Sequence, residues 1–287
     1  MPDITSIVYA VISGIIQGVT EWLPVSSTGH LIIFDSLMKS RMDPEIFTPD
    51  FTEMFNVVIQ LGSILAVVAL YFGRLDPLSK NKTKAERKKA FRLWGRIALA
   101  SVPVFAAGLL FDGFLSEKVF VEPQVNFIIA GALFVYGVLF VIIDKRTKNK
   151  TSRITSPEDM TPGTAFGVGA FQVLALIPGT SRSGSTILGA TALGASRSAA
   201  AEFSFFLAIP VMFGASGLKA VKYISQGTAF SFSQTVTLFV GTATAFIVSL
   251  FAVKFLVSFV KRRGFAPFGW YRMILSAFVA LFFAINK

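Results

Sequence analysis

Pro24-Val25-Ser26-Ser27-Thr28-Gly29-His30 is a polar stretch near the end of the first of two long apolar segments, residues 4–37. A similar stretch, Pro178-Gly179-Thr180-Ser181-Arg182-Ser183-Gly184-Ser185-Thr186, lies in the middle of the second, residues 162–195. Proline breaks the hydrogen-bond ladder of a helix, and the hydroxyl residues that follow are good N-caps for a new helix. We therefore expect each segment to fold as a re-entrant helix–loop–helix hairpin rather than as a simple membrane span.

The composition of the chain is that of an integral membrane protein. Hydrophobic residues make up 53% of the 287 residues and charged residues only 15%, and the mean hydropathy is +0.66. A soluble domain carries about 25% charged residues because its surface faces water. This composition also excludes a disordered chain or a collagen, and the absence of cysteine excludes a disulfide scaffold.

Six further segments are long and apolar enough to cross a bilayer, which takes roughly 20 residues. Three basic segments separate them and together hold 18 of the 27 lysines and arginines: Arg74 to Arg96, 144–160, and Lys261 to Arg272. The positive-inside rule places all three in the cytoplasm, and both chain ends outside it. A reading of these segments as lipid-headgroup or nucleic-acid patches explains their alternation less well. The predicted spans are 52–73, 96–114, 124–143, 202–225, 235–260 and 271–286.

The order of segments predicts an all-α fold with an internal inverted repeat in a single membrane domain. Residues 1–143 contain one hairpin and three spans, and residues 162–287 repeat that order from the opposite side of the membrane. Glu53 and Glu202 open the first span of their respective halves. Inverted repeats place broken helices together near the bilayer midplane, so we expect the two polar loops to meet there and to form the site.

The first loop offers an acid, a hydroxyl and an imidazole. Gln17 and Glu21 are four residues apart and share a helix face. A carboxylate in an apolar hairpin is costly unless paired, which makes Glu21 a functional candidate, although a purely structural salt bridge to Arg182 would also explain it. Ser27 and His30, the only histidine, follow within nine residues. We expect Ser26 to act as a helix cap, and Ser27 to face the site.

The second loop has the composition of a phosphate cradle. Arg182 is permanently charged and can bind phosphate oxygens in a bidentate manner. Gly179 and Gly184 allow backbone amides to approach an anion, and a hydroxyl-capped helix start carries partial positive charge. The chain has no HExxH or GxxxxGK[ST] motif and no metal-ligand cluster of His, Cys and Asp. A divalent ion would therefore rest on Glu21 and on phosphates of the substrate.

With these motifs in view, the chain resembles the undecaprenyl pyrophosphate phosphatases, also called bacitracin-resistance proteins. Three motifs carry the resemblance, which covers essentially the whole chain: Gln17 and Glu21 for Glu/Gln-x-x-x-Glu, Ser26 to His30, and Pro178 to Thr186 for Pro-Gly-x-Ser-Arg-Ser-x-x-Thr. Many relatives have Glu where Gln17 stands. Glutamine cannot be a base, so Glu21 would carry any acid–base or metal role alone.

The resemblance implies a bacterial inner-membrane enzyme that removes one phosphate from undecaprenyl diphosphate. This reaction recycles the lipid carrier for peptidoglycan and confers bacitracin resistance, with the active site facing the periplasm and a divalent cation, Mg²⁺ or Ca²⁺, as cofactor. It also implies a catalytic core of Glu21, Ser27, His30 and Arg182. The residues expected to bind substrate are Gln17, Ser26, Thr28, Gly179, Thr180, Ser181, Ser183 and Thr186.

Three questions stay open at the level of sequence. Ser27, activated by Glu21 or His30, is our predicted nucleophile, with a transient phosphohistidine at His30 as the rival. A transporter or flippase of the polyprenyl phosphate carrier is the alternative function, because inverted repeats with broken helices are typical of transporters. Apart from membrane lipids and the lipid substrate we expect no nucleic-acid partner, and a homodimer is left open.

Overall fold

The computed structural model describes residues 2–114, 124–225 and 230–285, and within these ranges it is a helical bundle with no strand. Six helices are long and apolar enough to cross a membrane, which confirms the predicted all-α, multi-pass fold. They are α3 (Pro49–Leu75), α4 (Lys84–Phe114), α5 (Gln124–Thr147), α8 (Arg197–Ser225), α9 (Phe232–Arg263) and α10 (Ala266–Ile285). The connection predicted at 115–123, residues 226–229 of the connection predicted at 226–234, and the last residue of the span 271–286 lie outside the described residues.

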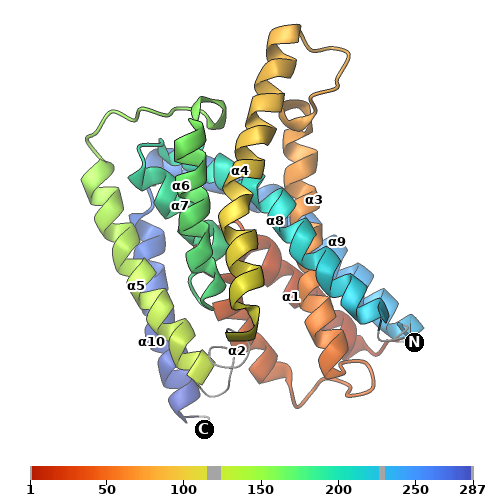
Figure 1. The fold of residues 1–287 in the computed structure, drawn as a ribbon. Helices are drawn as coiled ribbons and strands as arrows, with labels where there is room; N and C mark the ends of the chain where they lie inside the picture. Colours follow the sequence, from red (N-terminus) through yellow and green to blue (C-terminus); the bar gives the residue numbers. More distant parts are fainter. Residues whose placement is uncertain (1, 115–123, 226–229, 286–287) are drawn as a thin grey trace.

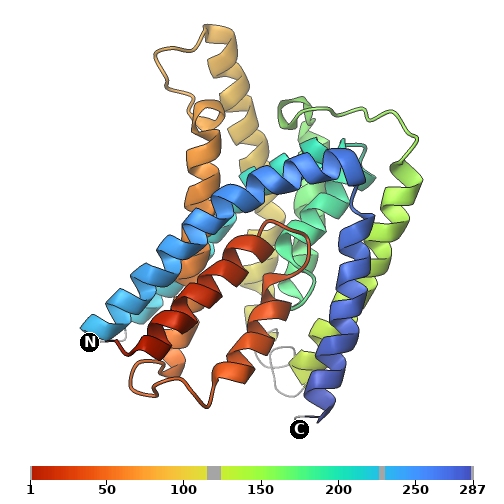
Figure 2. The same cartoon turned by 180° about the vertical axis from the view of Figure 1, so that it is seen from behind.

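The two interrupted segments each turn back on themselves. In the first, α1 (Ile4–Thr20) and α2 (Ser27–Met38) lie side by side, and in the second, α6 (Pro162–Val173) and the short η3 (Leu174–Leu176) are followed by α7 (Arg182–Ala192). Both hairpins lie between the α5–α10 pair and the other long helices, with their tips inside the bundle (Figures 1 and 2). The tips touch, because the Ser183 hydroxyl lies 3.5 Å from the Leu23 carbonyl oxygen.

Several of the main helix contacts recur when the two halves of the chain are exchanged. Helix α1 packs on α9 as α6 packs on α4, α3 packs on α9 as α8 packs on α4, and α2 contacts α10 as α7 contacts α5. The α5–α10 pair is its own equivalent and is very close: a Cβ on Gly269 would lie 2.6 Å from the Gly137 carbonyl oxygen. Small residues allow such close approach between membrane helices. This pattern is what an inverted repeat requires, and the division at 143 and 162 stays a prediction.

Two of the predicted basic loops are largely helical, which corrects their extents. Helix α4 begins at Lys84, so only 76–83 connects it to α3, and both helices rise beyond the rest of the bundle (Figure 1). Lysine, arginine, alanine and glutamate are good helix formers, and water solvates their charges where the helix leaves the lipid. Helix α10 already begins at Ala266, which places Arg272 inside a helix and not in the third basic loop.

Ion pairs hold α3 and α8 together at both ends. Near the end of α3, Arg74 binds Glu202 of α8 at 2.8 Å and Glu158 at 2.8 Å, the latter in the short helix η2 (Pro157–Asp159) that precedes α6. At the other end, Glu53 of α3 pairs with Lys219 of α8 at 2.7 Å. Glu53 and Glu202 therefore anchor their helices to one another.

Candidate functional site at the hairpin tips

Two serines with the same unusual backbone conformation start the second helix of each hairpin. Ser26 has φ 74° and Ser181 has φ 70°, and they are the only non-glycine residues with positive φ in the described chain. The hydroxyl of Ser26 accepts a hydrogen bond from the Gly29 amide, and that of Ser181 accepts one from the Gly184 amide. A non-glycine residue in this region costs about 1–3 kcal/mol, and such strain concentrates at functional sites.

These caps place Ser27 and Arg182 at the first position of α2 and α7, and both side chains reach Glu21. The Ser27 hydroxyl donates to Oε2 of Glu21 at 3.2 Å, and Nη2 of Arg182 binds Oε1 at 3.0 Å. Gln17, one turn before Glu21, donates from Nε2 to the same Oε2 at 2.9 Å. The structure thus unites four predicted site residues around one carboxylate, at the positive ends of two helices.

Arg182 is held in place by groups that the sequence analysis did not select. Its Nη1 donates to the Ser204 carbonyl at 2.7 Å and approaches the Ser204 hydroxyl at 3.3 Å, while the guanidinium lies 5.5 Å from the centre of the Trp22 ring. The hydroxyl of Thr186 lies 2.6 Å from that of Ser204. Thr186 also donates to the Arg182 carbonyl at 2.9 Å, so it contacts both Arg182 and Ser204, and α8 contributes to the surroundings of Arg182.

His30 lies beside this cluster without a hydrogen bond to Glu21 or Ser27. Its Nδ1 lies 2.7 Å from the Ser26 carbonyl oxygen and its Nε2 lies 2.6 Å from the Tyr271 hydroxyl, with the two rings stacked. A carbonyl only accepts, so Nδ1 carries the proton, and in the neutral ring Nε2 accepts from Tyr271. The nitrogen with a free electron pair is thus occupied by a phenol.

The remaining predicted residues divide between the loop scaffold and the surface. Gly179 has φ 91°, and a Cβ there would lie 2.7 Å from the Ile129 backbone, so only glycine fits. The Thr180 hydroxyl donates to the carbonyls of η3 and of Ile177, and Ser183 lies 3.1 Å from the Ser181 hydroxyl. Thr28 is exposed. These positions shape the loops, and none contacts Glu21 directly.

Arg272 is the main residue of the site that the sequence analysis misplaced. It is fully buried, and its guanidinium donates to the Pro24 carbonyl at 3.1 Å and to the Gly179 and Thr180 carbonyls at 2.9 and 3.1 Å. It also lies 5.4 Å from the centre of the Tyr136 ring. One side chain therefore ties both loops together. Its signal in the sequence is a single charge with apolar neighbours on both sides, which inside a membrane is functional by default.

The site carries more positive than negative charge. Arg272 is fully buried and the Arg182 side chain is only 12% exposed, and Glu21 is the one carboxylate with which either of them pairs in the described residues. Three buried donors of these two arginines and of Trp22, which packs on Arg182, have no hydrogen-bond partner in the described residues: Nε of Arg182, Nε of Arg272 and Nε1 of Trp22. Buried donors without acceptors are costly. The arrangement therefore favours binding of an anion with several oxygen atoms.

A divalent cation finds few protein ligands at this place. The described residues contain no group of three or more His, Cys, Asp or Glu that could hold a metal ion. Two oxygen donors do fit: the Glu21 carboxylate and the buried Oε1 of Gln17, which has no hydrogen-bond partner. Mg²⁺ is commonly held by one or two carboxylates together with substrate phosphates. The site fits such a cation only if the substrate completes its coordination.

A buried, positively charged site at the meeting point of two broken helices defines a multi-pass membrane protein that acts on an anionic group within the bilayer. The chain belongs to the bacitracin resistance protein BacA family, whose profile matches residues 10–278. It is 51% identical over 269 residues to the undecaprenyl-diphosphatase of Enterococcus faecalis, covering 93% of this chain and 94% of that protein.

Other relatives with the same name match over almost their whole length. The undecaprenyl-diphosphatase of Lachnoclostridium phytofermentans is 47% identical, covering 99% of this chain and all of that protein. That of Streptococcus agalactiae serotype V is 45% identical, covering 98% of both chains. The family resemblance seen in the three sequence motifs is therefore confirmed.

We expect Arg272→Lys to loosen the two loops. A lysine ammonium is a point donor without the fork of a guanidinium, so it cannot reach the carbonyls of both loops at once. Because hydrogen bonds from charged groups contribute about 1.5–3 kcal/mol each, the unfolding free energy should fall by about 2 kcal/mol or more. Thermal unfolding in detergent measures this, with Arg262→Lys at an exposed position of α9 as control. A variant as stable as the wild type would show that Arg272 does not tie the loops.

Proposed function

We propose that this protein hydrolyses the phosphoanhydride bond of undecaprenyl diphosphate, releasing inorganic phosphate and the lipid monophosphate. The observation that carries the proposal is the geometry at Glu21, where one carboxylate oxygen binds Arg182 and the other accepts the Ser27 hydroxyl. A nucleophile, its base and a phosphate-binding cation thus meet at one point. The shared name of the relatives, undecaprenyl-diphosphatase, supports the substrate.

Substrate binding begins with the ion pair between Glu21 and Arg182. Arg182 is bound to a carboxylate of lower charge than a diphosphate, so the terminal phosphate of the substrate competes for its guanidinium. Once Arg182 has transferred to the phosphate, the Glu21 carboxylate is released from its ion pair and can accept the Ser27 proton. The salt bridge between Glu21 and Arg182 then has a role in catalysis, because the substrate breaks it when its phosphate binds Arg182.

In the first chemical step, the Ser27 oxygen attacks the terminal phosphorus as Glu21 takes the hydroxyl proton. A bond forms between Ser27 Oγ and phosphorus, and the bond from phosphorus to the bridging oxygen breaks, so the lipid monophosphate leaves with the electron pair. Arg182 and the starts of α2 and α7 stabilise the charge on the phosphoryl oxygens. The proton on Glu21 then passes to the departing lipid monophosphate. In the second step, Glu21 deprotonates a water that attacks the phosphoserine. The bond from phosphorus to Ser27 Oγ breaks, Oγ takes the proton back from Glu21, and inorganic phosphate is released.

His30 fits a supporting role better than that of the nucleophile. Its Nε2 is occupied by the Tyr271 hydroxyl at 2.6 Å, and attack from His30 would require this contact to break. Ser27 needs no such rearrangement. His30 lies one turn after Ser27 on α2, where it can hold the loop through the Ser26 carbonyl.

A divalent cation, Mg²⁺ or Ca²⁺, forms part of the proposal. Glu21 and Gln17 Oε1 are the protein oxygens that would hold it. When bound, it would neutralise charge on the diphosphate and polarise the phosphoryl oxygens.

Location in the bacterial inner membrane, with the site open to the periplasm, is part of the same proposal. The basic segments 74–96 and 144–160 mark the cytoplasmic side, and the first hairpin enters from the opposite side. A homodimer stays a prediction, which the mass of the particle in nanodiscs would test.

Arg182→Ala should abolish most phosphate release from a C15 polyprenyl diphosphate. Loss of one preorganised charge from a reaction centre lowers the rate by about 10²–10³-fold. Arg182→Lys keeps the buried charge and is the second variant, used in case Arg182→Ala does not fold. Arg262→Ala removes an exposed arginine and is the matched control, which should retain the wild-type rate. Wild-type protein that binds the diphosphate but releases no phosphate with Mg²⁺ or Ca²⁺ present would favour the transporter alternative.

Ser27→Ala and His30→Ala separate the two candidate nucleophiles. With substrate labelled on the terminal phosphate, rapid quenching should trap an acid-stable phosphoprotein in the wild type and in His30→Ala. The label should be absent from Ser27→Ala, because alanine has no hydroxyl to be phosphorylated. Acid distinguishes the two adducts, since a phosphoserine ester survives it and a phosphohistidine does not. An acid-labile label that persists in Ser27→Ala would transfer the nucleophilic role to His30.

Gln17→Glu should strengthen the response of the protein to divalent cations. Without a cation, two carboxylates one helical turn apart repel each other and the melting temperature should fall. With Mg²⁺ or Ca²⁺ it should rise by more than that of the wild type, because two carboxylates then bind the ion. Sodium at matched ionic strength is the control. Equal shifts in both proteins would place the cation elsewhere.

Single cysteines test the orientation, since the natural chain has none. A cysteine at position 230 should react with a membrane-impermeant maleimide in intact cells, and one at position 84 should react only after lysis. The reverse pattern would turn the proposed site towards the cytoplasm.

A further inference from the structure

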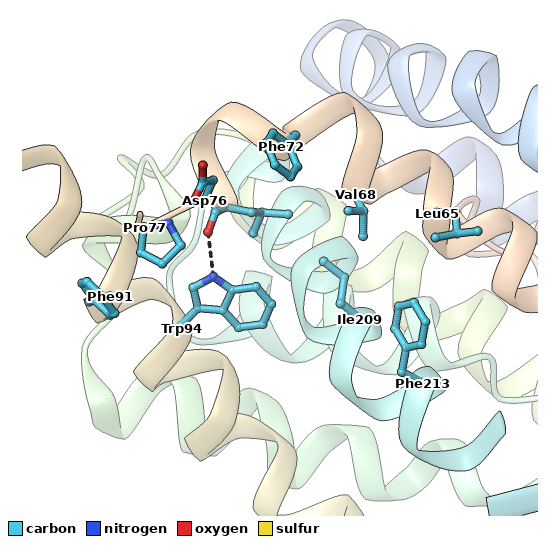
Figure 3. A pocket seen from close by; sticks show the side chains of 10 residues that line it. Leu65, Val68, Phe72, Asp76, Pro77, Phe91, Trp94, Ile209 and Phe213 are labelled. Atoms are coloured by element: carbon cyan, nitrogen blue, oxygen red, sulfur yellow. Dashed lines mark hydrogen bonds between the residues drawn. The ribbon is translucent and has the colours of Figure 1, made fainter. Parts of the chain in front are cut away.

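A groove of about 600 Å³ lies between α3, α4 and α8, near the end of the bundle where α3 and α4 project. Figure 3 shows its walls: Val68 and Phe72 from α3, Phe91 and Trp94 from α4, and Ile209 from α8. Asp76 is the one polar residue among the ten that line it. The Trp94 indole donates to the Leu75 carbonyl at 2.7 Å, which fixes the ring at the wall (Figure 3). The volume is that of a small-ligand site, and the lining suits only a hydrocarbon.

This groove is separate from the site at the hairpin tips. Ser204 of α8 contacts Arg182 on one face of the helix. Ile209 and Phe213, which line the groove, lie five and nine residues further along, which at 3.6 residues per turn is about 140° and 180° around the axis. The body of α8 therefore lies between the groove and Glu21, so the groove does not hold the reacting end of the substrate.

One face of α4 continues the groove into a cationic rim. Lys84, Lys88 and Phe91 are spaced by four and three residues on a continuous helix, so they lie along one stripe. Phe91 lines the groove, whereas both lysines are exposed and form no ion pair within the described part of the chain. An apolar wall followed by free cations along one helix face matches a hydrocarbon chain that carries an anionic headgroup.

Several charged groups near the rim have interactions of their own. Arg74 is bound by Glu158 and Glu202, and Arg87 donates to the carbonyls of the 76–83 connection. Asp76 accepts the Leu78 amide at 2.8 Å, and Glu86 accepts from the amide and hydroxyl of Thr83. Lys84 and Lys88 are the exposed cations on the same stripe of α4 as Phe91, so they are the ones that can extend the groove with a headgroup contact.

We propose that this groove is a binding site for one acyl chain of an anionic glycerophospholipid, whose phosphate lies at Lys84 and Lys88. Basic residues beside a membrane surface attract anionic lipids, and each contributes modestly. The lipid fills the space between α3, α4 and α8 on the basic side of the protein. The site is independent of the phosphatase reaction and would exist whether or not the proposed function holds.

Native mass spectrometry of the intact protein tests the site. The probes are palmitoyl-oleoyl phosphatidylglycerol and the zwitterionic phosphatidylcholine with the same chains. We expect the wild type to retain one phosphatidylglycerol in preference to phosphatidylcholine. The pair Lys84→Gln and Lys88→Gln should reduce this preference by roughly tenfold. Leu65→Trp, which fills the groove, should remove the retained molecule of either lipid.

The matched control is the pair Lys148→Gln and Lys150→Gln, two exposed lysines of the 144–160 segment that do not line the groove. This variant should keep the preference of the wild type. A preference that survives Lys84→Gln with Lys88→Gln, or falls equally in the control, would overturn the assignment of the headgroup. Lipid retention unchanged by Leu65→Trp would overturn the groove itself.

Discussion

The structure depends on how non-helical backbone is satisfied in the middle of an apolar bundle. Two loops interrupt helices there, where lipid offers no hydrogen bonds and an unpaired carbonyl is costly. Arg272 resolves this by donating to carbonyls of both loops from a third element, α10. The same loops then present Ser27 and Arg182 to a single carboxylate. The same two arginines therefore support the fold and favour an anion. Their positive charges are stabilised by backbone carbonyl groups and by one glutamate.

Much of this arrangement follows from local sequence. The six spans are predictable from the length of their apolar segments. The two broken segments are predictable because a proline followed by hydroxyl residues interrupts each of them. The cluster of Gln17, Glu21 and Ser27 is similarly local, since all three lie on one helix end and its loop. Arg182 was identifiable as the partner of Glu21 because a permanent cation in an apolar hairpin needs an acid.

The residues that were missed depend on contacts between distant elements. Ser204 and Tyr271 reach the site because of how α8 and α10 are rotated about their axes, and Trp22 reaches it from the turn after α1. The sequence pattern of the two loops does not determine these orientations. Arg272 was assigned to a basic loop because three cations precede it closely, yet Gly264 ends α9 and α10 begins only two residues later. The contact of His30 with Tyr271 depends on distant elements in the same way, because α10 brings the phenol to the imidazole of α2.

Ser27 and Arg182 occupy the same place in two loops of the same design, each following a serine with a left-handed backbone. Under the proposed mechanism, the difference between an attacking hydroxyl and an anchoring cation thus resides in one side chain of each half. Two identical halves would offer either two nucleophiles without a clamp or two clamps without a nucleophile. In the proposed mechanism, a symmetric pair of loops therefore supports asymmetric chemistry through the difference between Ser27 and Arg182 alone.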